Sequence, residues 1–229
     1  MNTINFATRT YVKEFLKYFR YKRVYSKFRQ FTMVQEREYI DCMDLVARAR
    51  DIKGAVIECG VWRGGSIAGI SHILGNDRNY YLFDSFEGLP PAKEIDGVEA
   101  IEYQKDPDSP HYHDNCSAEE SWAIQAMTKA GTKNYFLKKG WFENTVPSFE
   151  LNEPIAVLRL DGDWYESTMT CLTHFFPKVQ PGGLIILDDY YVWEGCSKAL
   201  HDYLSMHKRK ERIVRAYTAG CYLIKKEEE

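Results

Sequence analysis

Two short apolar runs near the middle of the chain end abruptly in aspartates, and this feature restricts the possible folds most. The runs are Ile155–Leu160 and Leu184–Leu187, and the aspartates that follow them are Asp161, Asp163, Asp188 and Asp189. Continuous rather than alternating apolar runs are typical of strands buried on both faces of a parallel sheet. The intervening residues have a helical pattern, so positions 158–190 predict a strand, a helix and a second strand.

The carboxyl ends of neighbouring parallel strands lie at one edge of a sheet, where open α/β sheets bind ligands. Carboxylates gathered there repel one another, and their pKa values rise unless a positive charge lies between them. Mg²⁺ prefers oxygen ligands and keeps water positions open for a substrate. The aspartates therefore predict a divalent cation site. The plainer alternative is that Asp188 and Asp189 form a polar strand end and that Asp161 caps a helix.

A glycine-rich turn follows an earlier apolar run that begins at Ala55. Gly60, Gly64 and Gly65 lead from this expected strand into an expected helix at Ile67–Leu74. Glycines let the backbone approach a ligand closely, and the start of a helix offers free N–H groups. The spacing matches neither a dinucleotide-binding fingerprint nor a P-loop. Alone the turn is weak support for a ligand, because many α/β folds use one simply to join a strand to a helix.

The next apolar run, at residues 80–83, ends in Asp84. An acid at the end of the second strand, about twenty residues beyond the glycine turn, commonly binds a ribose diol. The turn and the acid together predict a cofactor that contains adenosine, without identifying it. Trp141 follows the third expected strand, Tyr135–Lys139, where it could stack on an adenine or pack in the core.

The remaining pattern completes a single α/β domain of 229 residues. Helices are expected at residues 36–50, 117–130 and 195–206, and an antiparallel strand pair at 213–217 and 221–225. The six cysteines show no C-x-x-C spacing, which argues against a zinc knuckle and suits reduced thiols in the cytoplasm. No secretory leader and no apolar run of ~20 residues is visible, so we expect a soluble, cytoplasmic protein.

Residues 1–31 differ from the rest, with eight basic residues against one acid and interleaved aromatics, although the whole chain has a net charge of −3. We expect an N-terminal helical extension that packs its aromatics on its own domain or on a partner subunit. The alternative interpretations of this segment are a membrane-surface helix and a patch that binds nucleic acid. The overall negative charge excludes the protein as a whole from the strongly basic nucleic-acid binders.

The segment from 84 to 120 has the opposite character, with eleven acids and two lysines. A long loop of this kind is a lid, a binding loop or disordered. His111 and His113 lie within it. Because this loop and the basic extension both adjoin the expected cofactor pocket, we predict that they form its lid, within one chain or across a homodimer. The alternative is that each is a separately solvated surface and that the helix serves only as a dimer contact.

Taken together, the motifs resemble the macrocin/mycinamicin sugar O-methyltransferase family over roughly residues 32–204. The five motifs that carry the resemblance occur in the family's order at residues 57–66, 82–88, 140–142, 158–167 and 182–190. The resemblance implies a Rossmann-like, seven-stranded class I methyltransferase sheet within residues 32–229. It also implies S-adenosylmethionine as methyl donor and a Mg²⁺-dependent transfer to a hydroxyl of a small molecule, most simply a sugar of a natural product or saccharide.

The resemblance also implies roles for individual residues. The expected metal ligands are Asp161, Asp188 and Asp189. The positions expected to bind the donor are Met33, Glu58, Gly60, Val61, Trp62, Gly64, Ser66, Asp84, Ser85, Trp141, Phe142 and Asp161. Met33 belongs to the segment that would close over the donor's methionine end, Glu58 would lie near that end, and Asp84 would accept from the ribose hydroxyls.

Transfer from a sulfonium depends mainly on holding an acceptor oxygen in line with the methyl group. That oxygen must also lose its proton to a nearby base. The candidates are Asp163, His111, His113 and Asp161, and the sequence does not choose among them.

Three other functions compete with this one. A catechol-type phenol O-methyltransferase would share the chemistry. A nicotinamide-dependent oxidoreductase would share the fold, but the glycine spacing is wrong, and Tyr135 and Lys139 would stand about 13 Å apart on a strand. A non-catalytic cofactor-binding scaffold would not need the complete set of acidic residues.

Overall fold

The computed structural model describes residues 3–109 and 112–227, with side chains from residue 15 onward except that of Lys17. These residues form one seven-stranded sheet in the order β3-β2-β1-β4-β5-β7-β6. The strands are β1 (Ala55–Cys59), β2 (Tyr80–Asp84), β3 (Tyr135–Lys139), β4 (Ile155–Leu160), β5 (Val179–Leu187), β6 (Val214–Arg215) and β7 (Cys221–Ile224). The first five are parallel, and β7 runs antiparallel to both β5 and β6. The expected Rossmann-like, seven-stranded sheet is therefore confirmed.

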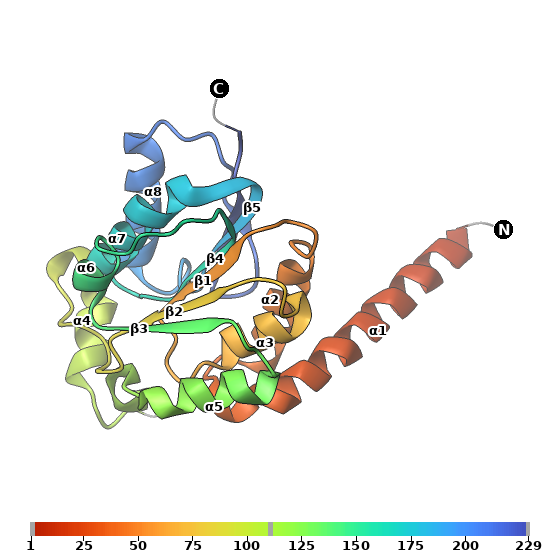
Figure 1. Cartoon of the computed structure of the whole chain (residues 1–229), viewed down its shortest axis with the longest axis horizontal. Coiled ribbons are helices and arrows are strands. Elements are labelled where there is room, and N and C mark those ends of the chain that lie inside the picture. The colour runs from red at the N-terminus through yellow and green to blue at the C-terminus, as the bar shows by residue number, and fades with distance from the viewer. Residues whose placement is uncertain (1–2, 110–111, 228–229) are drawn as a thin grey trace.

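Helices cover both faces of the sheet (Figure 1). They are α1 (Thr3–Phe28), α2 (Glu36–Ala47), α3 (Gly65–Leu74), α4 (Val98–Lys105), α5 (Glu120–Ala130), α6 (Phe142–Thr145), α7 (Tyr165–Phe175) and α8 (Glu194–Met206). One apolar core joins α2, α3, α5 and the end of α1 to one face, and a second joins α7 and α8 to the other. Single 3₁₀ turns occupy Arg29–Phe31, Glu94–Asp96, His113–Cys116 and Phe176–Lys178.

The register of the central strands decides which residues leave the sheet together. Every residue of β1 and of β4 is buried, as expected for strands covered on both faces. Cys59 pairs with Leu160, and Leu160 pairs with Leu187, so β1, β4 and β5 end side by side. The residues that come next in the chain, among them Asp161 and Asp188, therefore emerge at the same edge.

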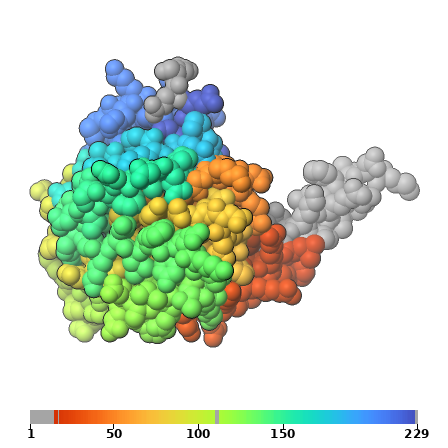
Figure 2. Space-filling model, viewed as in Figure 1, coloured from red at the N-terminus to blue at the C-terminus, as the bar shows by residue number. Residues whose placement is uncertain are grey.

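Helix α1 is attached to the domain only by its last turns. Tyr21, Val24 and Phe28 are buried in the core that contains α2 and α3, and Lys22 Nζ lies 2.8 Å from Glu36 Oε1. The helix lies away from the body of the molecule upstream of these turns (Figure 1), and Figure 2 shows in red its last turns against the edge of the domain. None of the described helices is both long and apolar enough to cross a membrane.

The acidic segment between β2 and α5 is folded against the carboxyl edge and includes α4. Trp164 Nε1 donates to the carbonyl of Pro90 at 2.8 Å, and the backbone N–H of Tyr165 donates to Asp96 Oδ1 at 2.7 Å. Asp96 is buried despite its charge. These bonds connect the segment to the start of α7, directly after the aspartates that follow β4.

Candidate active site

A cavity of about 440 Å³ opens at the carboxyl edge of the sheet. Its walls come from the ends of β1, β2, β4 and β5, the start of α6, the segment before α2 and the acidic segment. This is where ligands bind in open α/β sheets. No described residue of α1 lines the cavity, so the expected lid role of that helix has no contact to support it within one chain.

The glycine-rich turn approaches the end of β4 closely. Gly60 has φ +89°, and a Cβ at this position would lie 1.8 Å from the carbonyl oxygen of Asp161. Only glycine fits here without moving the backbone, because other residues strain in this conformation and would also collide with the neighbouring chain. The tight turn brings the end of β1 beside the first aspartate after β4.

Asp84 fixes the turn through backbone hydrogen bonds. The N–H groups of Val61 and Trp62 donate to its Oδ2 at 2.6 and 2.7 Å, and that of Phe86 donates to its Oδ1 at 2.6 Å. Burial raises the pKa of Asp84, and the three N–H groups oppose that rise. The carboxylate also lines the cavity, so it both shapes the turn and can accept a bond from a ligand.

Most residues expected to bind a donor line this cavity. They are Met33, Gly60, Trp62, Asp84, Ser85, Trp141, Phe142 and Asp161. Val61, Gly64 and Ser66 belong to the turn and the start of α3 but are not part of the lining, and Glu58 lies beneath it with its side chain buried. Trp141 is half-buried at the cavity wall, a position open to a flat ring.

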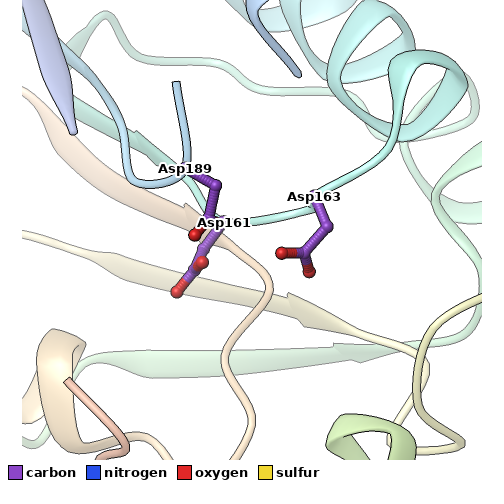
Figure 3. Close-up of side chains that lie close together, drawn as sticks. All are labelled: Asp161, Asp163 and Asp189. Carbon is purple, nitrogen blue, oxygen red and sulfur yellow. The ribbon is translucent and has the colours of Figure 1, made fainter. Parts of the chain in front are cut away.

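Three carboxylates meet at the cavity. Asp161, Asp163 and Asp189 each offer an oxygen within 4.8 Å of the others, as Figure 3 shows. Asp189 Oδ2 is buried and has no hydrogen-bond partner among the described residues. A buried carboxylate oxygen without a partner is costly, so this oxygen could serve as a metal ligand. Three carboxylates and no sulfur or nitrogen donor suit a hard cation such as Mg²⁺.

Burial and mutual proximity raise the pKa values of two of these carboxyl groups. Burial, with a further contribution from Asp161, raises the pKa of Asp163 to about 8. Burial and the neighbouring Asp163 and Asp161 also raise the pKa of Asp189. Trp193 Nε1 donates to Asp163 Oδ1 at 2.8 Å, and the backbone of Asp163 has φ +56°. This uncommon conformation for a non-glycine residue directs the carboxylate into the cluster.

Asp188 lies in a different environment from the other strand-end aspartates. It lines the cavity, but its Oδ1 lies 2.6 Å from Arg159 Nη2 and also accepts from the Tyr217 hydroxyl. Burial raises its pKa to about 6, against the opposing effect of Arg159. The group that could hold a metal thus contains Asp163 where the sequence led us to expect Asp188.

Arg159 was missed by the sequence analysis. It belongs to β4, is 1% exposed, and contacts Glu58 at 2.8 Å and Asp161 at 2.7 Å through Nη1. Burial raises the pKa of Glu58 to about 8, although Arg159 opposes this rise. A charged residue inside an otherwise apolar run was the signal that could have found it, because a buried charge needs partners.

Two of the expected proton acceptors, Asp161 and Asp163, line the cavity. His113 lines the cavity, whereas His111 lies outside the described residues. Tyr103, Cys116 and Trp193, which the sequence analysis did not single out, also line it. Tyr103 and Trp193 form an aromatic wall on the side of Asp163, with their rings 5.6 Å apart.

Comparison with known proteins places this site in a family. A family model described as macrocin O-methyltransferase (TylF) matches residues 28–225. Mycinamicin III 3''-O-methyltransferase of Micromonospora griseorubida is 34% identical over 75% of this chain and 68% of the relative. A tetracenomycin-C rhamnosyl 4'-O-methyltransferase of Streptomyces olivaceus is 34% identical over 79% of this chain and 69% of that protein.

A solved structure agrees with the sequence comparison. The O-methyltransferase NovP aligns with a TM-score of 0.71 and 26% identity, over 86% of this chain and 83% of its own. The family-model match, residues 28–225, includes all seven strands and the strand ends that build the cavity. The chain therefore belongs to the macrocin O-methyltransferase (TylF) family and is an S-adenosylmethionine-dependent O-methyltransferase with a class I methyltransferase fold.

Proposed function

We propose that this enzyme methylates a hydroxyl of a sugar carried by a natural product or saccharide, with the help of Mg²⁺. The names of the relatives, which act on mycinamicin III and on a rhamnosyl tetracenomycin, support a glycosylated acceptor. The cluster of Asp161, Asp163 and Asp189, with its buried oxygen lacking a partner, carries the proposal of a cation. The aromatic wall beside Asp163 suits the apolar face of a sugar ring.

We propose that Asp161, Asp188 and Asp189 hold the cation, as their motif positions imply, and that Asp163 takes the proton of the acceptor hydroxyl. When bound, the cation would act as a Lewis acid that lowers the pKa of that hydroxyl and orients it. Asp163 has the raised pKa that suits a base at neutral pH, and Trp193 fixes one of its oxygens.

The donor would occupy the part of the cavity between the glycine turn and Trp141. Gly60 allows the backbone to approach it, Asp84 is placed to accept from its ribose, and Trp141 is placed to stack on its adenine. These residues would hold the methyl group against the acceptor oxygen. Such positioning can supply ~7–11 kcal/mol of the barrier reduction.

The proposal is tested by methyl transfer to a panel of sugars, glycosides and catechols, with S-adenosylmethionine and either Mg²⁺ or a chelator. We expect transfer to a sugar hydroxyl that stops in chelator and returns with Mg²⁺. Transfer to catechols alone would make the enzyme a phenol methyltransferase, and donor binding without transfer to any acceptor would favour a scaffold. Undiminished turnover in chelator would exclude a role for the metal.

Variants separate the two roles of the acidic residues. We expect Asp188→Asn to weaken Mn²⁺ binding, measured by electron paramagnetic resonance, and Asp163→Asn to lower kcat while Mn²⁺ still binds. The reverse pattern would make Asp163 a metal ligand, as the observed grouping allows, and would leave His113 as the base that lines the cavity.

We also propose that the enzyme is a cytoplasmic homodimer in which α1 contacts a second copy. All six cysteines are free thiols, which suits a reducing compartment. Phe15, Leu16 and Phe19 are 52%, 62% and 47% exposed, and helical spacing places them opposite the buried Tyr21, Val24 and Phe28. An exposed apolar stripe of this kind is typical of an interface.

Sedimentation velocity tests this contact. We expect the triple substitution F15S/L16S/F19S to shift a dimer towards monomer. Met206→Ser, which removes another largely exposed apolar side chain at the end of α8, should leave the oligomeric state unchanged. A wild-type monomer at micromolar concentration would overturn the proposal.

A further inference from the structure

One guanidinium connects the ends of three adjacent strands beneath the active-site cavity. Arg159 on β4 contacts Glu58 on β1, Asp161 directly after β4, and Asp188 directly after β5, all within 2.8 Å. The strand register explains the first contact, because Glu58 and Arg159 are paired neighbours on β1 and β4. Arg159 is 1% exposed, so water does not screen these contacts.

The arrangement uses the geometry of arginine. Nη1 is shared between Glu58 Oε1 and Asp161 Oδ2, and Nη2 binds Asp188 Oδ1. A guanidinium presents five N–H donors in a rigid planar fork, whereas a lysine ammonium is a compact charge with three rotatable donors. Each carboxylate is therefore held through one oxygen, and its rotamer is set by a bond on the side away from the cavity.

The charges around Arg159 do not balance. Three carboxylates meet one guanidinium, and Asp163 and Asp189 lie beside them without a cation of their own in the described structure. A guanidinium stays protonated in folded proteins. Arg159 thus stays charged, and it is the one positive charge among these acidic strand ends in the described part of the chain.

We propose that Arg159 is a positioning residue that serves as a permanent internal cation, aligning Glu58, Asp161 and Asp188 whether or not a divalent cation is bound. This inference rests on the proposed function in that it places the divalent cation at the same aspartates. Arg159 and the divalent cation then share the neutralisation of Asp161, from opposite sides. The donor side of the site, which Glu58 supports from beneath, stays assembled when the metal is absent.

Replacement of Arg159 should make the site depend on the divalent cation. In Arg159→Met the uncompensated carboxylates repel one another, so the enzyme should be less stable in chelator. Mg²⁺ should then raise the melting temperature of Arg159→Met by more than it raises that of the wild type. The variant has more uncompensated negative charge for the cation to offset, and a ligand stabilises the folded state to which it binds. Affinity for S-adenosylhomocysteine in chelator should fall by about tenfold or more, as expected when buried charged groups lose a partner.

Two further variants distinguish positioning from simple loss of a buried arginine. Arg159→Lys keeps the positive charge but lacks the forked donor geometry of the guanidinium. Compared with Arg159→Met, it should recover most of the stability and only part of the affinity for S-adenosylhomocysteine. Arg209→Met removes a second arginine, which binds the buried Glu211 at 2.6 Å away from the cavity. It should lower the melting temperature while leaving both the Mg²⁺ increment and the affinity for S-adenosylhomocysteine at the wild-type values.

The measurements are differential scanning fluorimetry and calorimetry on the full chain, each with EDTA or with Mg²⁺. Equal Mg²⁺ increments in wild type and Arg159→Met would overturn the proposal, as would wild-type affinity for S-adenosylhomocysteine in chelator. If Arg159→Met does not fold, Arg159→Lys decides, since wild-type affinity there would show that the fork does not position the acids. If the wild type binds no divalent cation, the metal part of the proposed function fails, and the chelator measurement still tests Arg159.

Discussion

Buried acids at the two edges of the sheet have pKa shifts in opposite directions. Near the start of β5, Arg209 binds Glu211 through two nitrogens, and the N–H of Lys226 donates to the same carboxylate. Burial would raise the pKa of Glu211, but these donors hold it below its ordinary value. At the carboxyl edge, by contrast, the pKa of Asp188 is raised to about 6 even though Arg159 lies 2.6 Å away.

The difference separates a structural ion pair from a binding site. At the first edge Arg209 and the N–H of Lys226 stabilise the charge of Glu211. Among the described residues, the carboxyl edge has more acids than bases, and one buried carboxylate oxygen of Asp189 has no hydrogen-bond partner. An imbalance of this kind costs stability unless a ligand offsets it, and it is typical of functional sites.

The largest expected effect comes from substituting an acid at the carboxyl edge of the sheet. Asp189→Asn should lower kcat by about a thousandfold, or ~4 kcal/mol, because it removes charge that a catalytic cation requires. Steady-state methyl transfer at saturating donor measures this loss. Melting temperature in chelator should not fall, since one of the mutually repelling acids is gone. Wild-type turnover would show that Asp189 plays no part in the reaction.

Substituting the arginine near the start of β5 should instead lower stability and leave activity unchanged. Arg209→Met leaves the buried Glu211 without its cation and should cost ~3 kcal/mol of unfolding free energy. Urea denaturation followed by circular dichroism measures the change. Specific activity of the folded enzyme should match that of the wild type, and a large fall in kcat would contradict a purely structural role for this pair.

The third prediction concerns the binding of the donor ribose by Asp84 at the carboxyl edge. Asp84→Ala removes an acceptor for the donor ribose and should cost ~1.5–3 kcal/mol of donor binding, measured by calorimetry. Because three backbone N–H groups also lose their acceptor, stability should fall as well. Asp84→Asn keeps one acceptor oxygen and should retain more stability than affinity. Unchanged affinity in both variants would place the ribose elsewhere.

The smallest effect concerns pH. Raised pKa values mean that Asp188 and Asp163 still hold protons at pH values where ordinary carboxyls have lost them. A cation bound at this cluster competes with those protons, so its affinity should rise with pH up to about 6 through Asp188 and up to about 8 through the neighbouring Asp163, by at most ~1.4 kcal/mol per pH unit for each proton. The metal-free protein should lose stability as pH rises through this window, because its folded state still holds protons that the unfolded state has released. A flat Mn²⁺ titration across it would contradict the assignment.

Local pattern was enough to predict much of the framework. The bounds of β3 and β4 agree residue for residue with the apolar runs at Tyr135–Lys139 and Ile155–Leu160. The aspartates that follow β4 and β5 meet at one edge as expected, because parallel strands end together. The glycine-rich turn and Asp84, the last residue of β2, likewise line the cavity, through Gly60 and Asp84 itself. Each of these features depends on neighbours within a few residues or on a general rule of sheet architecture.

Only the tertiary structure decided how the charges pair. Strand register, which no local pattern encodes, places Glu58 beside Arg159 although 101 residues separate them. The turn that gives Asp163 its positive φ directs its carboxylate to Asp161 and Asp189, while Tyr217 and Arg159 engage Asp188. The sequence alone determined that acids would gather at this edge. Which oxygen faces the cavity depends on distances of a few ångströms between strands, and the folded packing alone sets those distances.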